Sequence, residues 1–198
     1  MIKLLIKFFT FLSFKLGGWT FENKLPKEAK KYLLIAVPHT SNWDMYYALT
    51  SFYMMKVPVR FAIKNDWLKF PFKKMMLSVG AIGVDRGKNK LKKVSLVDSI
   101  VELYNKHEEL IICITPEGTR SRNPKWKTGF YHIAVKAKVP IAVGVCDYKN
   151  KRTTIHKLIY PSGNMKADLQ EIATFYNPSQ AKIPENFAFD VEATVAGK

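Results

Sequence analysis

Cysteine is scarce in this sequence: Cys113 and Cys146 are the only two among 198 residues. Two thiols are too few for the disulfide framework of a small secreted domain, which excludes that class of fold. Both lie in apolar runs, so we expect buried free thiols in a reducing compartment. The two cysteines and four histidines show none of the spacings typical of zinc ligands, and we expect no metal site.

Long uninterrupted apolar runs are missing as well. Residues 1–19 are largely apolar but contain Lys3, Lys7 and Lys15, whereas a membrane-spanning helix needs about 20 mostly apolar residues. On a helix the lysines share one side and Ile, Leu and Phe cover the rest. This pattern predicts an amphipathic helix on an anionic membrane surface, with Trp19 at the headgroup layer. The alternative is a helix that packs on its own domain. No small-x-small cleavage site follows, so we expect no cleaved signal peptide.

Acidic residues are few compared with basic ones. The chain has 32 Lys and Arg residues against 16 Asp and Glu residues, a formal net charge of +16. A field of this sign favours an anionic partner, which leaves nucleic acid, an acidic membrane surface or a phosphorylated substrate. The sequence carries no helix-turn-helix, RNA-recognition or zinc-finger signature, so we do not expect nucleic acid as the partner.

What the sequence does contain is an alternation of strand-like and helix-like segments. Short apolar runs predict strands at 31–37, 59–63, 80–84, 110–114, 140–147 and 153–160. Segments with helical character predict helices at 43–55, 67–78, 89–105, 128–138 and 165–176. Such alternation is typical of a single α/β domain with a mostly parallel central sheet flanked by helices, here over residues 20–198. The weakly patterned tail after Pro178 is expected to fray at its end.

Loops at the ends of these strands carry reactive side chains, and chemistry gathers at such loops in parallel sheets. In the first loop, His39 leaves a buried strand and Asp44 follows five residues later, in the first turn of a helix. That spacing lets the carboxylate fold back onto one imidazole nitrogen and leaves the other nitrogen free as a base. The alternative is that Asp44 only stabilises the helix N-terminus and His39 is a turn residue.

Two further loops contribute basic, acidic and glycine residues. In residues 115–122, Gly118 permits close approach of the backbone to a ligand and Glu117 can hold a hydroxyl group. The Arg120 guanidinium can bind a phosphate through two hydrogen bonds. A third loop presents Arg86 between two glycines. Taken singly, each of these loops is also compatible with a solvated polar turn.

Together the three loops resemble the signature motifs of the glycerolipid acyltransferase superfamily, in the family's order and over about residues 32–148. The motifs are a His-x4-Asp pair, a strand ending in Arg, a Phe-Pro-Glu-Gly-Thr-Arg-Ser run and a Val-Pro-Ile strand. They are matched here by His39 with Asp44, Arg86, Pro116–Ser121 and Val139–Ile141. Thr115 stands in the place of the Phe, Pro38 in the place of an Asn and Gly144 in the place of a Pro, which leaves the acceptor open.

The resemblance implies an O-acyltransferase that moves a fatty acyl group from a thioester, acyl-CoA or acyl carrier protein, to a lysophospholipid hydroxyl. It favours 1-acylglycerol-3-phosphate as acceptor, with phosphatidate as product, and implies no cofactor. His39 would be the base and Asp44 its orienting partner. The residues expected to bind substrate are Glu117, Gly118, Thr119, Arg120, Arg86 and Lys64, the last of which leaves the strand 59–63. The acyl-groove candidates are Trp43, Phe61, Trp67, Phe70, Phe72, Met75 and Met76.

The same resemblance, together with the charge and the basic amphipathic N-terminus, implies a peripheral or monotopic protein at the cytoplasmic face of the cell membrane. Two alternatives stay open. The acceptor is a different lipid hydroxyl, such as that of an aminoacyl lipid, or the protein is a catalytically inactive basic module that only binds membranes.

Overall fold

The computed structural model of the chain describes residues 11–64, 73–78, 80–84 and 95–197. The strands are β1 (Thr20–Asn23), β2 (Lys31–Val37), β3 (Val59–Lys64), β4 (Ala81–Val84), β5 (Leu110–Ile114), β6 (Ile141–Asp147) and β7 (Arg152–Ile159). The helices are α2 (Asn42–Met54), α3 (Lys73–Ser78), α4 (Leu96–Lys106), α5 (Gly129–Ala137), α6 (Met165–Ala173) and α7 (Val191–Ala196), with short 3-10 helices at Pro178–Gln180 and Pro184–Asn186.

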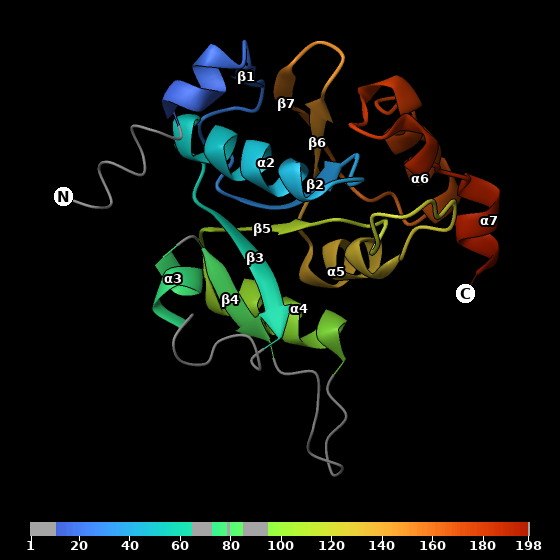
Figure 1. The fold of residues 1–198 in the computed structure, drawn as a ribbon. Coiled ribbons are helices and arrows are strands. Elements are labelled where there is room, and N and C mark those ends of the chain that lie inside the picture. Colours follow the sequence, from blue (N-terminus) through green and yellow to red (C-terminus); the bar gives the residue numbers. More distant parts are fainter. Residues whose placement is uncertain (1–10, 65–72, 79, 85–94, 198) are drawn as a thin grey trace.

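The strands form one seven-stranded sheet in the order β1-β7-β6-β2-β5-β3-β4 (Figure 1). Neighbouring strands are parallel except for β6 and β7, which form an antiparallel pair. Strand β2 lies between β6 and β5, and its two faces are covered by two separate hydrophobic cores, which explains its continuous apolar sequence. The parallel pairing of β2 with β5 brings the loops that follow these two strands to the same edge of the sheet.

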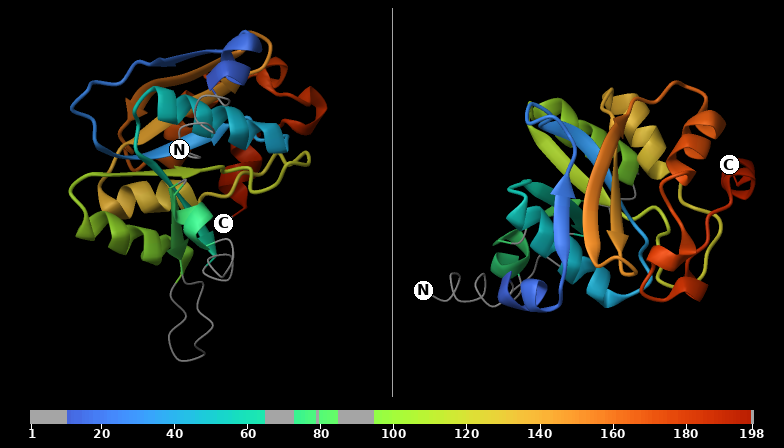
Figure 2. Two further views of the ribbon diagram at one scale, coloured as in Figure 1. Left: turned by 60° about the vertical axis from the view of Figure 1, so that its left-hand side comes forward. Right: turned by 90° about the horizontal axis from the view of Figure 1, so that it is seen from above.

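Side chains of β2 alternate between two hydrophobic cores on opposite faces of the sheet. Leu33 and Ile35 belong to a core that includes Ile100 of α4 and Phe130 of α5. Leu34 belongs to a second core that includes Phe52 of α2. Helix α2 therefore covers one face, and α4 and α5 cover the other (Figure 2). This arrangement confirms the prediction of a single α/β domain with a mostly parallel sheet.

The segments predicted as strands are strands, and the predicted helices occur with shifted ends. Within the described residues, α3 begins at Lys73 and α4 at Leu96, because the first parts of the predicted helices 67–78 and 89–105 lie outside the described residues. The edge strand β1 was not predicted, since its four residues carry no clear alternation. It pairs with β7 through a regular parallel register.

The C-terminal tail packs on the domain as far as α7; residue 198 lies outside the described residues, so the prediction that the last residues fray stays a prediction. Trp126 stacks on Phe189 with 3.7 Å between ring centroids and donates its indole N–H to the Ala188 carbonyl at 3.1 Å. The Trp126 backbone N–H is bonded to the hydroxyl of Thr194 in α7, at 3.1 Å. Trp126 therefore holds the tail through a ring stack and two hydrogen bonds. The sequence of the tail has no periodic pattern that predicts these contacts.

The N-terminal segment packs on the domain through two aromatic side chains. Residues 11–16 are helical, and the segment 1–10, with Lys3 and Lys7, lies outside the described residues. Phe14 is fully buried and Trp19 is 4% exposed. The Trp19 ring stacks on Tyr47 of α2 at 3.9 Å. The prediction that Trp19 occupies a headgroup layer is therefore wrong, because its ring belongs to the domain. In the described part of the chain, no helix has the length and apolar character needed to cross a membrane.

Candidate active site

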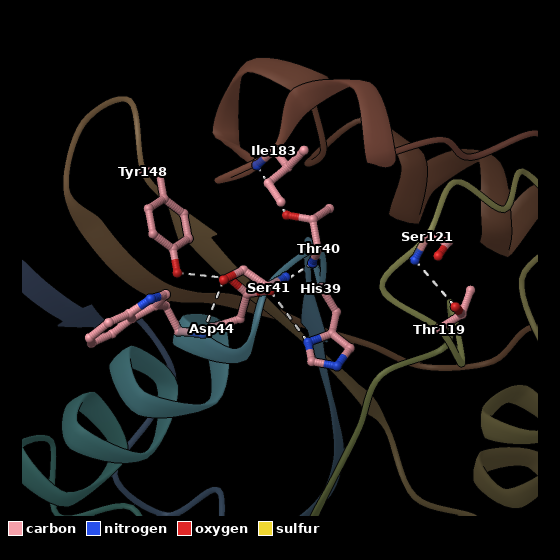
Figure 3. A network of polar contacts seen from close by, with 9 residues as sticks. His39, Thr40, Ser41, Asp44, Thr119, Ser121, Tyr148 and Ile183 are labelled. Atoms are coloured by element: carbon pink, nitrogen blue, oxygen red, sulfur yellow. Dashed lines mark hydrogen bonds and ion pairs between the residues drawn. The ribbon is translucent and has the colours of Figure 1, made fainter.

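The loop after β2 places a histidine and a carboxylate side by side. The chain leaves β2 through a cis Val37–Pro38 peptide bond, and His39 follows. Nδ1 of His39 lies 3.4 Å from Oδ2 of Asp44, the pairing that their spacing predicts (Figure 3). Ser41 caps the N-terminus of α2, and Asp44 at the third helical position completes a capping box. The pairing of His39 with Asp44 therefore follows from the way this helix begins.

Both oxygens of the buried Asp44 carboxylate accept hydrogen bonds. Oδ2 accepts the backbone N–H groups of Thr40 at 2.6 Å and Ser41 at 2.7 Å, and Oδ1 accepts the hydroxyl of Tyr148 at 2.7 Å. These bonds hold the carboxylate in one orientation beside His39. With an acceptor facing Nδ1, the imidazole carries its proton there, and Nε2 is left with a free lone pair. The pair has the polarity of a general base and its orienting acid.

His39 lines a cleft of about 650 Å³, a size suited to a lipid-like ligand. The polar and charged lining residues are His39, Asp44, Thr115, Thr119, Arg120 and Lys127. The apolar lining comes from α2, β3, α4 and α5, with Phe52, Phe61, Ile100, Phe130 and Ile133 among its residues. The cleft thus joins a titratable group and two cations to an apolar wall.

Lys127 crosses the turn that contains Gly118. Gly118 has a φ of +68°, in the left-handed region that favours glycine. A Cβ at this position would meet side-chain atoms of Lys127 at 2.7 to 2.9 Å. The Lys127 backbone N–H is also bonded to the Pro116 carbonyl at 2.8 Å. Gly118 is therefore required by its backbone conformation. The contact with the end of the Lys127 side chain was missed in the sequence, and it adds little to this requirement because that side chain can move aside.

The Glu117 side chain is buried and does not line the cleft, so the structure gives no support to the expectation that it binds a substrate hydroxyl. It is 4% exposed, it is not among the residues that line the cleft, and its Oε2 atom has no hydrogen-bond partner in the described part of the chain. Burial raises the pKa of Glu117 to about 7, although a hydrogen bond from the backbone of His39 and the imidazole itself act to lower it. The Glu117 carboxyl group therefore contacts the His39 loop through a hydrogen bond from the His39 backbone.

The remaining predicted residues fall into two groups. Thr119 and Arg120 line the cleft with Gly118, as expected, and the Thr119 hydroxyl accepts the backbone N–H of Ser121 at 3.2 Å (Figure 3). Arg86 lies outside the described residues, and so does the side chain of Lys64, so their predicted roles stay predictions.

Among the acyl-groove candidates, Phe61 lines the cleft. Trp43 does not: it is 54% exposed, and the ammonium of Lys182 lies 5.1 Å from its ring centroid. The others lie outside the described residues, wholly or in their side chains: Trp67, Phe70, Phe72, Met75 and Met76.

Two contacts to the His39 loop come from distant parts of the chain and were not predicted. Tyr148 reaches Asp44 across 104 positions, and the Ile183 backbone N–H donates to the Thr40 hydroxyl at 3.2 Å (Figure 3). Sequence separation hides both contacts, because neither residue belongs to a local motif. Among the described residues, no cluster of three or more His, Cys, Asp or Glu side chains is suited to hold a metal ion.

The raised pKa of Glu117 predicts a pH-dependent stability. Between pH 4.5 and about 7 the unfolded chain releases this proton while the folded chain keeps it, so the free energy of unfolding falls as the pH rises through this window. Glu117→Gln has no proton to release. Its free energy of unfolding, relative to the wild type, is expected to rise by up to about 3 kcal/mol from pH 4.5 to pH 8. Urea unfolding at several pH values measures this difference.

The matched control is Glu108→Gln, at an exposed position, which should change little over the same range. A Glu117→Gln difference that is independent of pH would contradict the burial argument.

Comparison with known proteins places this geometry in a family. The family described as Acyltransferase matches residues 19–146. The chain is 28% identical over 150 residues to a 1-acyl-sn-glycerol-3-phosphate acyltransferase of Haemophilus influenzae, covering 73% of this chain and 60% of that one. It is 31% identical over 137 residues to the Escherichia coli protein of the same name, covering 66% and 54%. The chain thus matches little more than half the length of these curated relatives.

A solved structure shows the same fold. The crystal structure of the 1-acyl-sn-glycerophosphate acyltransferase PlsC from Thermotoga maritima superposes with a TM-score of 0.58 at 19% identity, covering 86% of this chain and 74% of that one. The family match spans the strand–loop segments that hold His39, Asp44 and the Gly118 turn. It confirms the resemblance seen in the motifs, and the chain belongs to the Acyltransferase family.

Proposed function

We propose that this protein transfers a fatty acyl group from a thioester to the hydroxyl of 1-acylglycerol-3-phosphate, which yields phosphatidate and a free thiol. The observation that carries the proposal is the His39–Asp44 pair on the wall of a cleft that also holds cations and an apolar lining. Curated relatives named 1-acyl-sn-glycerol-3-phosphate acyltransferase support this choice of reaction and acceptor.

In the proposed reaction, Nε2 of His39 accepts the proton of the acceptor hydroxyl as its oxygen attacks the acyl carbonyl. A new C–O bond forms, the C–S bond breaks, and the proton passes from the imidazole to the departing thiolate. Asp44 accepts a hydrogen bond from Nδ1–H and stabilises the imidazolium while it exists. The bonds from Thr40, Ser41 and Tyr148 hold the carboxylate in place for this role.

The transfer is direct, without an acyl-enzyme intermediate. Both cysteines, Cys113 and Cys146, line the cleft. Burial raises the pKa of each thiol, that of Cys113 to about 12 and that of Cys146 well above its usual range. A thiol with so high a pKa stays protonated near neutral pH and is a poor nucleophile. The thioester itself supplies a good leaving group, so the hydroxyl needs only a base. No cofactor takes part in this scheme.

Arg120 and Lys127 supply the positive charge that a phosphate requires. Both line the cleft together with His39. The guanidinium can bind two phosphate oxygens at once, and the ammonium adds a point charge. Arg86 and Lys64, predicted from sequence for the same task, remain candidates. The apolar wall that includes Phe52, Phe61 and Ile100 would take the fatty acyl chain.

We also propose that the enzyme works on an anionic membrane surface at the cytoplasmic face, as a peripheral or monotopic protein. The net charge of +16 favours such a surface. Phe11, Leu12 and Leu16 are exposed on the N-terminal helix, where their burial in a lipid interface would stabilise binding. Residues 1–19 are the proposed membrane-surface helix, although Phe14 and Trp19 within it pack on the domain. The donor is acyl-CoA or an acyl carrier protein, both of which are acidic.

Replacing the proposed base tests the reaction itself. His39→Ala is expected to lower kcat by a factor of about 10² to 10⁴, because general-base assistance is lost. The measurement is thiol release from acyl-CoA and from acyl carrier protein, with lysophosphatidate in vesicles. His107→Ala is the matched control, since His107 is the exposed C-cap of α4 and does not line the cleft. Thiol release at the wild-type rate by His39→Ala, or none by the wild type with either donor, would contradict the proposal.

Replacing Arg120 tests the phosphate of the acceptor. Arg120→Ala is expected to raise KM for lysophosphatidate about tenfold or more, because a charge-assisted hydrogen bond is lost, and to leave KM for an uncharged monoacylglycerol within about twofold. Arg122→Ala is the control, since Arg122 donates to the Glu185 carbonyl and does not line the cleft. An equal rise in KM for both acceptors would assign Arg120 a different role and favour an acceptor without phosphate.

A further inference from the structure

The two oxygens of the Asp44 carboxylate are held in different ways. Oδ2 accepts two backbone N–H groups of its own loop, from Thr40 and Ser41, and faces Nδ1 of His39. Oδ1 accepts a side-chain hydroxyl from a residue 104 positions later in the chain, that of Tyr148. The backbone bonds fix one oxygen only, and the carboxylate is still able to turn about it. The contact at Oδ1 is the one that fixes the plane of the carboxylate.

Tyr148 is itself held rigidly. It follows the last residue of β6, Asp147, at the start of the turn to β7. Its ring makes T-shaped contacts with Trp19 and Tyr47, with 5.0 Å and 5.6 Å between the ring centroids. The ammonium of Lys182 lies 5.7 Å from the Tyr148 ring centroid. The hydroxyl thus reaches Asp44 from a ring fixed by the N-terminal segment, α2 and the C-terminal tail.

The hydroxyl acts as a donor at any working pH. Burial raises the pKa of Tyr148 far above its usual range, and the neighbouring Cys146 and Asp44 raise it further. Tyr148 therefore keeps its proton, and its hydroxyl donates a hydrogen bond to Oδ1 of Asp44. Within the part of the chain that the structure describes, Tyr148 is not among the residues that line the cleft, so it has no contact with a substrate there.

The contact between imidazole and carboxylate is sensitive to the orientation of the carboxylate. The separation of Nδ1 and Oδ2 is 3.4 Å, which is at the long end for a hydrogen bond of this kind. A small rotation of the carboxylate either closes this gap or opens it. Catalytic hydrogen bonds of this length in empty sites shorten when substrate binds, and that shortening requires a carboxylate that does not turn away.

We propose that Tyr148 is a positioning residue, whose hydroxyl locks the Asp44 carboxylate in the plane that lets it orient His39. The inference rests on the proposed function, in which His39 is the base. Because Tyr148 acts on the pair and not on the substrates, its removal affects turnover while leaving substrate binding intact.

Tyr148→Phe removes the hydroxyl and keeps the ring. We expect kcat for thiol release to fall by about 10 to 100 times, because a hydrogen bond to a charged group is lost, with KM for both substrates within about twofold of the wild type. In an Asp44→Ala background the same substitution should change kcat less than twofold, since the carboxylate it positions is gone.

The chain offers a close control. Tyr131 also donates its hydroxyl to a buried carboxylate, that of Asp168, at 2.6 Å, and neither residue lines the cleft. Tyr131→Phe should lower thermal stability at least as much as Tyr148→Phe, while its kcat stays within twofold of the wild type. A fall in kcat that is equal in the two variants, or that persists in full in the Asp44→Ala background, would overturn the proposal.

A second readout needs no activity. The ring ¹H and ¹⁵N resonances of His39 report the state of Nδ1, and they should shift in Tyr148→Phe and stay unchanged in Tyr131→Phe. Unchanged His39 resonances in Tyr148→Phe overturn the positioning role. If those resonances shift but His39→Ala turns over as fast as the wild type, the positioning role holds and the proposed function fails.

Discussion

The carboxylate of Asp44 is the constraint on which the rest of the site depends. It accepts the backbone N–H groups of Thr40 and Ser41, so it completes the N-terminus of α2 and closes the loop after β2. The same group faces the His39 imidazole and accepts the Tyr148 hydroxyl. One buried side chain thereby caps a helix, fixes a loop and faces the imidazole that we propose as the base. A capped helix terminus is a stable platform for such a base, because the folding energy of the helix itself holds the carboxylate in place.

A second carboxyl group near His39 has the opposite surroundings. Glu117 is buried with one oxygen lacking a partner in the described structure, and burial raises its pKa to about 7. Asp44, only a few residues from His39 in sequence, accepts three hydrogen bonds. The surroundings of the two carboxyl groups therefore differ: Asp44 lines the cleft and accepts hydrogen bonds, whereas Glu117 is buried and does not line the cleft. The Pro-Glu-Gly-Thr-Arg run consequently presents Thr119 and Arg120 to the cleft, with Glu117 facing inwards.

The sequence predicted those features that depend on local periodicity or short spacing. Continuous apolar runs identified the buried strands, and the short spacing between His39 and Asp44 predicted that their side chains pair. Features set by the packing of distant segments escaped prediction. Tyr148 and Lys127 reach the site because the strands before them, β6 and β5, pair with β2. Ile183 reaches it from the C-terminal tail. No local sequence pattern predicts these contacts. Trp19 was predicted as an interfacial residue because Lys and aromatic residues surround it in sequence. In the structure its ring packs inside the domain against Tyr47 and Tyr148.

The central claim is that Nε2 of His39 takes the proton of a lipid hydroxyl. The most direct measurement is a crystal structure of the enzyme with 1-acylglycerol-3-phosphate and a non-transferable acyl thioester analogue. The account predicts the acceptor hydroxyl within about 2.6 to 3.2 Å of Nε2, with the phosphate against Arg120. A complex in which both ligands occupy the cleft while the hydroxyl lies beyond the reach of His39, even through one water molecule, would contradict it.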